Sequence, residues 1–84
     1  MRTIGEVKLL DGRECVIIMP MGENYSRAMK KSQLSQEFDL TLFLMEELCR
    51  IDGQKMDLSF YKELYCDDYL KIMETLGSAI TPIR

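Results

Sequence analysis

The residues of this sequence best suited to chemistry are three cysteines and two pairs of adjacent carboxylates. A cysteine thiolate is both a nucleophile and a metal ligand. Cys15, Cys49 and Cys66 lie 34 and 17 positions apart, which does not resemble the spacing of zinc ligands. The chain contains no histidine, so the commonest general base and the Ser-His and Cys-His couples are missing. We therefore expect buried structural thiols and no metal site.

The carboxylate pairs are Glu46-Glu47 and Asp67-Asp68. Adjacent residues on a helix point in different directions, so neither pair is arranged as a catalytic dyad. We expect the first pair to lie on a solvated helix face and the second to cap a helix. Residues 52–57 lack the ligand spacing of a calcium loop. The sequence therefore predicts a protein that is not an enzyme and that binds no metal and no cofactor.

The length of 84 residues predicts a single domain, residues 1–84, with a small core. A domain of this size buries a little over ~60 % of its unfolded surface, so we expect it to rely on a partner or to form a homo-oligomer. No apolar stretch approaches the ~20 residues that cross a bilayer, and no secretory signal precedes the first strand. Three free thiols suit a reducing compartment. These features predict a cytoplasmic protein without membrane contact.

The net charge of −3 is distributed unevenly along the chain. Residues 1–34 contain six lysines and arginines against four acids, whereas residues 35–84 contain five against ten. The basic residues of the first part are too few, and too near acids, for a nucleic-acid surface. The acidic remainder favours docking of a basic partner or head-to-tail stacking.

A β-hairpin, about residues 3–19, opens the expected fold. Asp-Gly at positions 11 and 12 is a strong turn signal, because glycine accepts a positive φ and aspartate caps the turn. A two-residue loop sets Leu9 opposite Glu14, whereas a type I turn with a bulge at the glycine sets Leu9 opposite Arg13. We favour the second register, since it pairs Lys8 with Glu14 across the strands and gathers apolar side chains on one face. Those side chains are Val7, Leu9, Cys15 and Ile17.

Helices are expected after the hairpin, so the expected fold class is α+β, an N-terminal β-hairpin followed by three or four α-helices. The strongest helix repeats apolar residues every three or four positions on a stripe so wide that the helix must be central. Gly53 is its expected end. The predicted helices cover about residues 25–31, 37–51, 59–64 and 68–76, and residues 78–84 form a tail.

Two interpretations of residues 60–76 stay open. A single helix would align Tyr61, Tyr65, Tyr69 and Met73 along one stripe. Cys66-Asp67-Asp68 favours a break, because aspartate prefers helix caps to helix interiors. Gly77 is then the expected end of the last helix. Candidate N-caps of the other helices are Asn24, Ser35 and either Asp57 or Ser59.

Four aromatic residues are our candidates for partner contact. A tyrosine at an interface offers a rigid ring with a polar tip, and these rings exceed what so small a core needs. Seven methionines are also present, and methionine either fills core gaps or serves an adaptable binding surface. We expect alanine at the four aromatic positions to weaken association while helical content is kept. The four residues are Phe43, Tyr61, Tyr65 and Tyr69.

Three stretches of the chain occur in an order typical of a known family. Residues 6–20 contain a strand, an Asp-Gly-Arg turn and a second strand. Residues 42–53 form an apolar helix that ends near a glycine, and residues 64–77 carry leucines at helical spacing after an Asp-Asp pair. In this order they resemble the small tail assembly chaperones of tailed phages, the Mu-like group.

The resemblance implies a non-enzymatic chaperone of virion assembly. Such proteins bind the long, helical tape-measure protein, keep it soluble and help tail-tube subunits to assemble around it, and they leave before the tail is mature. In many phages a longer product arises by frameshifting. The family has no catalytic residues to carry over. The alternative hypothesis is a small cytosolic adaptor or transcription-type regulator, with nucleic-acid contacts made by the helix of residues 25–31.

Overall fold

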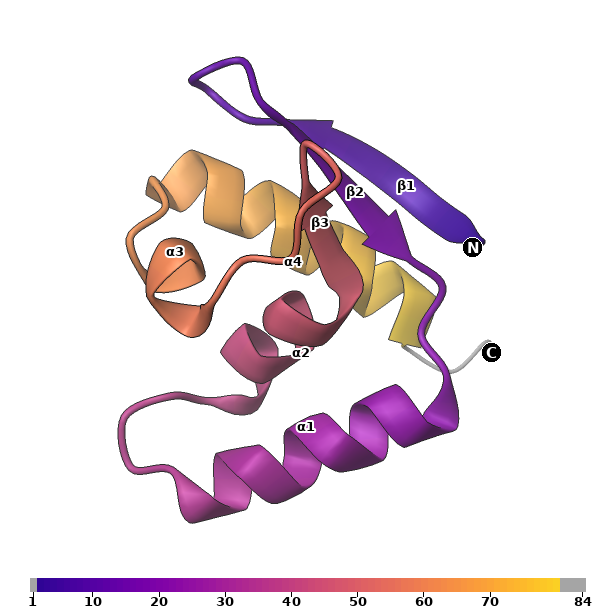
Figure 1. Cartoon of the computed structure of the whole chain (residues 1–84), viewed down its shortest axis with the longest axis vertical. Helices are drawn as coiled ribbons and strands as arrows, with labels where there is room; N and C mark the ends of the chain where they lie inside the picture. The colour runs from indigo at the N-terminus through magenta and orange to yellow at the C-terminus, as the bar shows by residue number, and fades with distance from the viewer. Residues whose placement is uncertain (1, 81–84) are drawn as a thin grey trace.

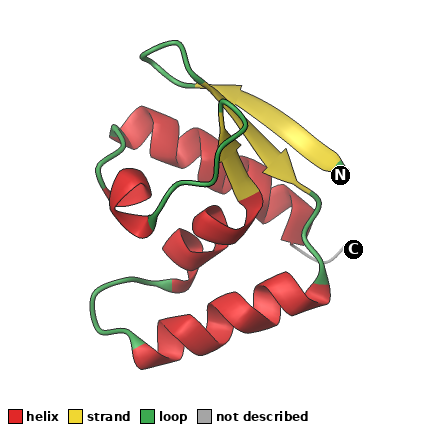
Figure 2. Cartoon of the chain, in the orientation of Figure 1, coloured by secondary structure: helices red, strands yellow, loops and turns green. Residues whose placement is uncertain are grey.

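In residues 2–80 a three-stranded antiparallel sheet packs against four helices (Figure 1). The computed structural model describes these residues, with side chains for residues 2–78. The sheet has the order β1 (Thr3–Lys8), β2 (Glu14–Ile18) and β3 (Cys49–Ile51). The helices are α1 (Gly22–Leu34), α2 (Leu40–Leu48), α3 (Leu58–Lys62) and α4 (Cys66–Ile80). The α+β class with an N-terminal hairpin is confirmed, and Figure 2 shows the separation of strands from helices.

The hairpin adopts the register that pairs Lys8 with Glu14. The Leu9 N–H donates to the Arg13 carbonyl at 2.8 Å, and the Gly12 N–H donates to the Leu9 carbonyl at 2.9 Å. Gly12 has a φ of +95°, a conformation that glycine adopts at little steric cost. The side chains on the inner face of the hairpin are buried, as this register predicts: Val7, Leu9, Cys15 and Ile17.

The boundaries predicted for the helix of residues 37–51 are wrong at both ends. Asp39 caps α2, accepting the Leu42 N–H at 3.0 Å, while Ser35 holds a separate turn by accepting the Phe38 N–H at 3.0 Å. Residues 49–51 leave the helix and pair with β2 as β3. This strand stabilises the hairpin, because two isolated strands are marginal in water.

Three further predictions about where helices begin and end are wrong. Helix α1 begins before Asn24, whose Oδ1 accepts the Met21 N–H at 2.9 Å from within the first turn. Gly53 does not end a helix: with a φ of +83° it lies in the turn that follows β3. Helix α4 continues through Gly77 to Ile80, since one helical glycine costs only ~1 kcal/mol. The tail predicted at residues 78–84 is therefore helical at 78–80, and residues 81–84 lie outside the described residues.

Two expectations about residues 57–76 hold. Asp57 caps α3, its Oδ1 accepting the Phe60 N–H at 3.1 Å. The chain breaks between α3 and α4, so the single-helix interpretation is excluded. This break sends neighbouring tyrosines in different directions.

Helix α2 lies between α1 and the sheet, as its wide apolar stripe predicts (Figure 1). Its contacts on both sides bury six of its nine residues, and the other three are half-buried. Helix α4 packs along β1, and a Cβ built on Gly5 of that strand would lie 3.0 Å from Cγ2 of Thr75. No helix within residues 2–80 combines the length and apolarity needed to cross a bilayer.

Candidate partner-binding site

Two of the four aromatic candidates, Phe43 and Tyr61, belong to the core. Phe43 is 7 % exposed and stacks edge-to-face on Phe38, with ring centroids 6.2 Å apart. Tyr61 is fully buried and donates its hydroxyl to the Cys49 carbonyl at 3.4 Å. Burial raises the pKa of Tyr61, because the ionised ring would lose its hydration. The expectation that these two rings are surplus to the core is wrong, since the core uses both.

The other two candidates are accessible to different degrees. Tyr65 is 73 % exposed in the connection between α3 and α4. Tyr69 is half-buried on α4 and packs against the core. Partial burial raises the pKa of Tyr69, and the nearby Asp39 carboxylate acts in the same direction. Only Tyr65 presents a largely free ring, so contact with a partner at Tyr65 and Tyr69 stays a prediction.

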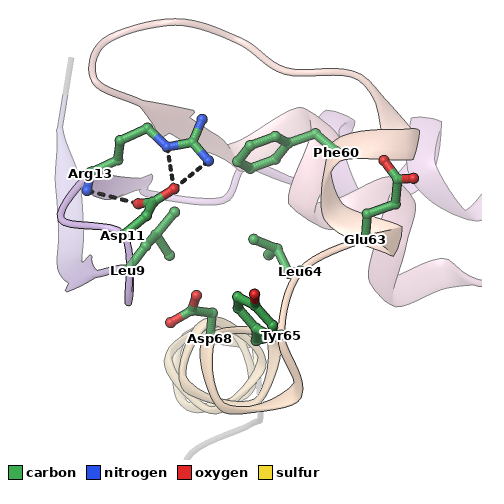
Figure 3. A pocket seen from close by; sticks show the side chains of 8 residues that line it. All are labelled: Leu9, Asp11, Arg13, Phe60, Glu63, Leu64, Tyr65 and Asp68. Carbon is green, nitrogen blue, oxygen red and sulfur yellow. Dashed lines mark hydrogen bonds and ion pairs between the residues drawn. The ribbon is translucent and has the colours of Figure 1, made fainter.

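A pocket of about 250 Å³ lies beside Tyr65, between the hairpin loop and the α3–α4 connection (Figure 3). In Figure 3 the side chains of Leu9, Leu64 and Tyr65 converge beside the Asp68 carboxylate. Leu10, which is 59 % exposed, follows Leu9 in the hairpin loop. The pocket therefore has apolar walls next to two exposed apolar side chains. Its lining residues are Leu9, Asp11, Arg13, Phe60, Glu63, Leu64, Tyr65 and Asp68.

The hairpin side of the pocket is held by an ion pair and a cation–π contact. Nη2 of Arg13 lies 2.6 Å from Oδ2 of Asp11, and Nε of Arg13 donates to the same oxygen at 2.7 Å. These hydrogen bonds lower the pKa of the Asp11 carboxyl group. The Arg13 guanidinium also lies 4.9 Å from the ring centroid of Phe60. The cation–π contact thus links the loop to α3, and the Arg13 charge is paired with the Asp11 carboxylate.

Asp68 connects the opposite side of the pocket to the same loop. It is only 3 % exposed, and its two carboxylate oxygens accept the Leu10 N–H at 3.2 and 3.3 Å. The expectation that Asp67 or Asp68 caps α4 is wrong, because both residues lie inside the first turn of the helix and the Asp68 carboxylate binds a residue 58 positions away. Asp67, in the same first turn, is exposed. Two adjacent acids therefore have unlike environments, which no local pattern reveals.

Glu47 is the second acid whose surroundings the sequence analysis missed. It is 7 % exposed, so the expected solvated face is wrong for this residue. Its Oε1 accepts from Nε of Arg27 at 3.0 Å and from Nδ2 of Asn24 at 3.2 Å, and Oε2 lies 3.9 Å from Nζ of Lys31. Desolvation alone would raise the pKa of Glu47, but the Asn24 and Arg27 hydrogen bonds together with the nearby positive charges of Arg27 and Lys55 lower that pKa. This cluster joins α1 to α2.

The spacing of the hydrogen-bond and ion-pair donors of this cluster is visible in the sequence. Asn24, Arg27 and Lys31 are three and four positions apart, so they share one face of α1. A polar stripe of this kind predicts an acidic partner on a neighbouring helix. Glu46 and Glu47 were the available acids, but only the fold decides which of them is buried.

The three cysteines differ in exposure. Cys15 and Cys49 are buried on neighbouring strands, whereas Cys66 is exposed at the start of α4, so the expectation of buried thiols is wrong for Cys66. The hydrogen bond that the Cys49 thiol donates to the Cys15 sulfur, together with burial, raises the pKa of Cys49. Among the described residues, no group of three His, Cys, Asp or Glu side chains is arranged to hold a metal ion.

Comparison of the chain with protein families, with curated proteins and with solved structures finds no match. The candidate site consists of the pocket and the exposed residues Leu10 and Tyr65. Its exposed leucine and tyrosine beside a small acidic pocket resemble the anchors and polar rim of a protein interface. The arrangement is suited to binding another polypeptide.

Proposed function

We propose that this chain is a non-enzymatic tail assembly chaperone that binds the tape-measure protein of a phage or prophage and assists tail-tube assembly in the host cytoplasm. Two things support the proposal. The order of hairpin, apolar helix and closing helix resembles that family, and the molecule exposes two large apolar side chains, Leu10 and Tyr65, that its own core does not use. The second observation carries the greater weight.

We define the client surface by Leu10, Tyr65 and the pocket that Tyr65 and Asp68 help to line. Leu10 and Tyr65 are 59 % and 73 % exposed, although each is large enough to be a core residue. Adjacent exposed apolar residues with a polar rim are typical of interaction sites. A long helical client offers apolar side chains at helical spacing, and these fit against such anchors.

The alternative function, nucleic-acid contact through residues 25–31, has less support. Arg27 and Lys31 both face Glu47, and Lys31 also lies 3.6 Å from Glu46. Carboxylates beside these two cations reduce the positive charge that α1 offers to a phosphate backbone. Retention of DNA or RNA that weakens steeply with salt would support the regulator and count against the chaperone.

The proposal is tested by co-expressing the chain with the product of a very long, coiled-coil-rich reading frame encoded beside it. We expect the soluble fraction of the long protein to rise several-fold with the wild-type chain. The double variant Leu10→Ser/Tyr65→Ser should lose most of that gain, because both changes remove apolar anchors from the client surface. Replacing exposed residues should leave the free energy of unfolding within about 0.5 kcal/mol of wild type.

Leu34→Ser is the matched control for this experiment. Leu34 is 88 % exposed at the far end of α1, so the variant removes a leucine that is more exposed than Leu10 from another part of the surface. It should solubilise the client as the wild type does. A client that is equally insoluble with and without the wild-type chain would refute the chaperone function.

Self-association is part of the same proposal. The small core and the exposed apolar side chains on α1 and α4 favour a homo-oligomer, and Leu70 and Met73 are 47 % and 37 % exposed on α4. Light scattering on the purified chain should give a mass above 9.8 kDa. A monomer at all accessible concentrations would remove self-association from the proposal.

A further inference from the structure

Asp68 combines deep burial with few stabilising partners. Within the part of the chain that the structure describes, its carboxylate receives one hydrogen-bond donor, the Leu10 N–H, shared between both oxygens. An ionised carboxylate has room for about four donors. Its position in the first turn of α4 adds a favourable interaction with the helix dipole. The remaining lone pairs of a buried charge are therefore available to a cation.

The pocket beside Asp68 is suited to a cation on an aliphatic stem. Leu9, Leu64 and the Tyr65 ring supply apolar walls, which match the methylene groups of a lysine. A volume of about 250 Å³ is smaller than that of pockets for drug-sized ligands, which begin at ~300 Å³. The size and the walls thus favour a single inserted side chain.

The charges around the pocket favour the same occupant. Three carboxylates, those of Asp11, Glu63 and Asp68, line it with one guanidinium, that of Arg13, so its formal charge is −2. Arg13 is held at Asp11 and over the Phe60 ring, on the hairpin side of the pocket. Asp68 in the first turn of α4 and the exposed Glu63 at the end of α3 have no ion pair among the described residues.

We propose that this pocket receives a lysine or arginine side chain of the client, from a position inside the apolar stripe of an amphipathic helix. The cation meets the Asp68 carboxylate, its stem lies against Leu64 and Tyr65, and neighbouring apolar residues of the same helix cover Leu10. This inference rests on the proposed function and specifies its partner as a helix with one cation among its apolar residues. A purely apolar helix would leave Asp68 buried without a counter-ion, which is costly.

The test uses two synthetic amphipathic helical peptides that are identical except at one central position of the apolar stripe, lysine in one and methionine in the other. Wild-type chain should bind the lysine peptide about 10- to 100-fold more tightly, as expected for a hydrogen bond between charged groups. Asp68→Asn removes the charge and keeps an oxygen for the Leu10 N–H, so it should abolish the preference.

Asp67→Asn is the matched control, because it removes one negative charge from the adjacent, exposed position. It should keep the preference for lysine. Glu63→Gln, on the exposed wall of the pocket, should reduce the preference only in part. The melting temperature of Asp68→Asn should equal or exceed that of wild type, since a sparsely paired buried charge is lost.

Three results would overturn the inference: equal affinity of the wild type for both peptides, an undiminished lysine preference in Asp68→Asn, or equal losses in Asp67→Asn and Asp68→Asn. The last would indicate general attraction to an acidic surface. If Asp68→Asn fails to fold, the Glu63→Gln result decides, and an unchanged preference there refutes the inference. Solubilisation of the long client by the wild type is measured separately, so failure of the pocket and failure of the chaperone function are distinguishable.

Discussion

Tyr61→Ala is expected to cost about 3–5 kcal/mol of unfolding free energy, which is the usual range for deleting a buried aromatic side chain. Tyr61 is fully buried, packs edge-to-face on Phe60 and donates to the Cys49 carbonyl of β3. The whole domain of 84 residues is expected to be stable by roughly 4–13 kcal/mol. At the lower end of that range, a loss of this size leaves a large fraction of the chain unfolded at 25 °C.

Urea denaturation followed by circular dichroism measures this effect. Tyr65→Ala is the paired control, because the same atoms are removed from a ring that is 73 % exposed. Its unfolding free energy should stay within about 0.5 kcal/mol of wild type. Equal stability of Tyr61→Ala and Tyr65→Ala would contradict the placement of Tyr61 in the core.

Glu47→Gln is expected to have the second-largest effect, a loss of about 1–3 kcal/mol. The variant keeps the size of the side chain and removes the charge that Arg27 and Lys31 face. We expect less than the full cost of breaking a buried ion pair, because both cations are more than 40 % exposed and so are partly screened by solvent. Glu46→Gln, on the adjacent and more exposed side chain, should cost no more than about 0.5 kcal/mol.

The Glu47 effect depends on pH in a defined direction. The pKa of Glu47 is lowered in the folded chain, so the folded state favours the ionised carboxylate. Its contribution is therefore complete above the unfolded pKa of ~4.3 and is lost as the pH falls through the folded pKa. The stability difference between wild type and Glu47→Gln should be constant from pH 7 to about pH 5 and shrink below that. A difference that grows on acidification would contradict the ion-pair account.

Local chemistry explains why the hairpin was predictable. The Asp-Gly turn and the Lys8–Glu14 charge pair both belong to residues a few positions apart, and together they select one register. The cap of α3 is local for the same reason, since Asp57 binds an amide three positions on. Features that depend only on residues a few positions apart can be predicted without knowledge of the fold.

The third strand was not predictable in this way. Residues 40–51 are so apolar that they satisfy the helical repeat throughout, and three strand residues are too few to display a period of two. Residues 49–51 become a strand because they pair with the free edge of β2, a segment far away in the sequence. The prediction for the tyrosines was wrong for a similar reason. The short break between α3 and α4 places Tyr61 in the core and Tyr65 on the surface.

The acids of the site depend on contacts far along the chain. Asp68 binds the Leu10 amide, and Glu47 meets Arg27 of another helix. Sequence spacing identified both as members of acidic pairs, but burial of one member of each pair follows from the packing of distant elements. The burial of Phe43 and Tyr61, and that of Asp68 and Glu47, could therefore be assigned only from the structure.

The most direct test of the binding surface is a titration of the isotope-labelled chain with a soluble helical fragment of the client, followed by amide chemical shifts. The account predicts that the largest changes fall on the amide of Leu10 and on residues 63–68, with residues 22–34 of α1 unaffected. Changes confined to α1, with Leu10 and Tyr65 unmoved at saturation, would contradict it.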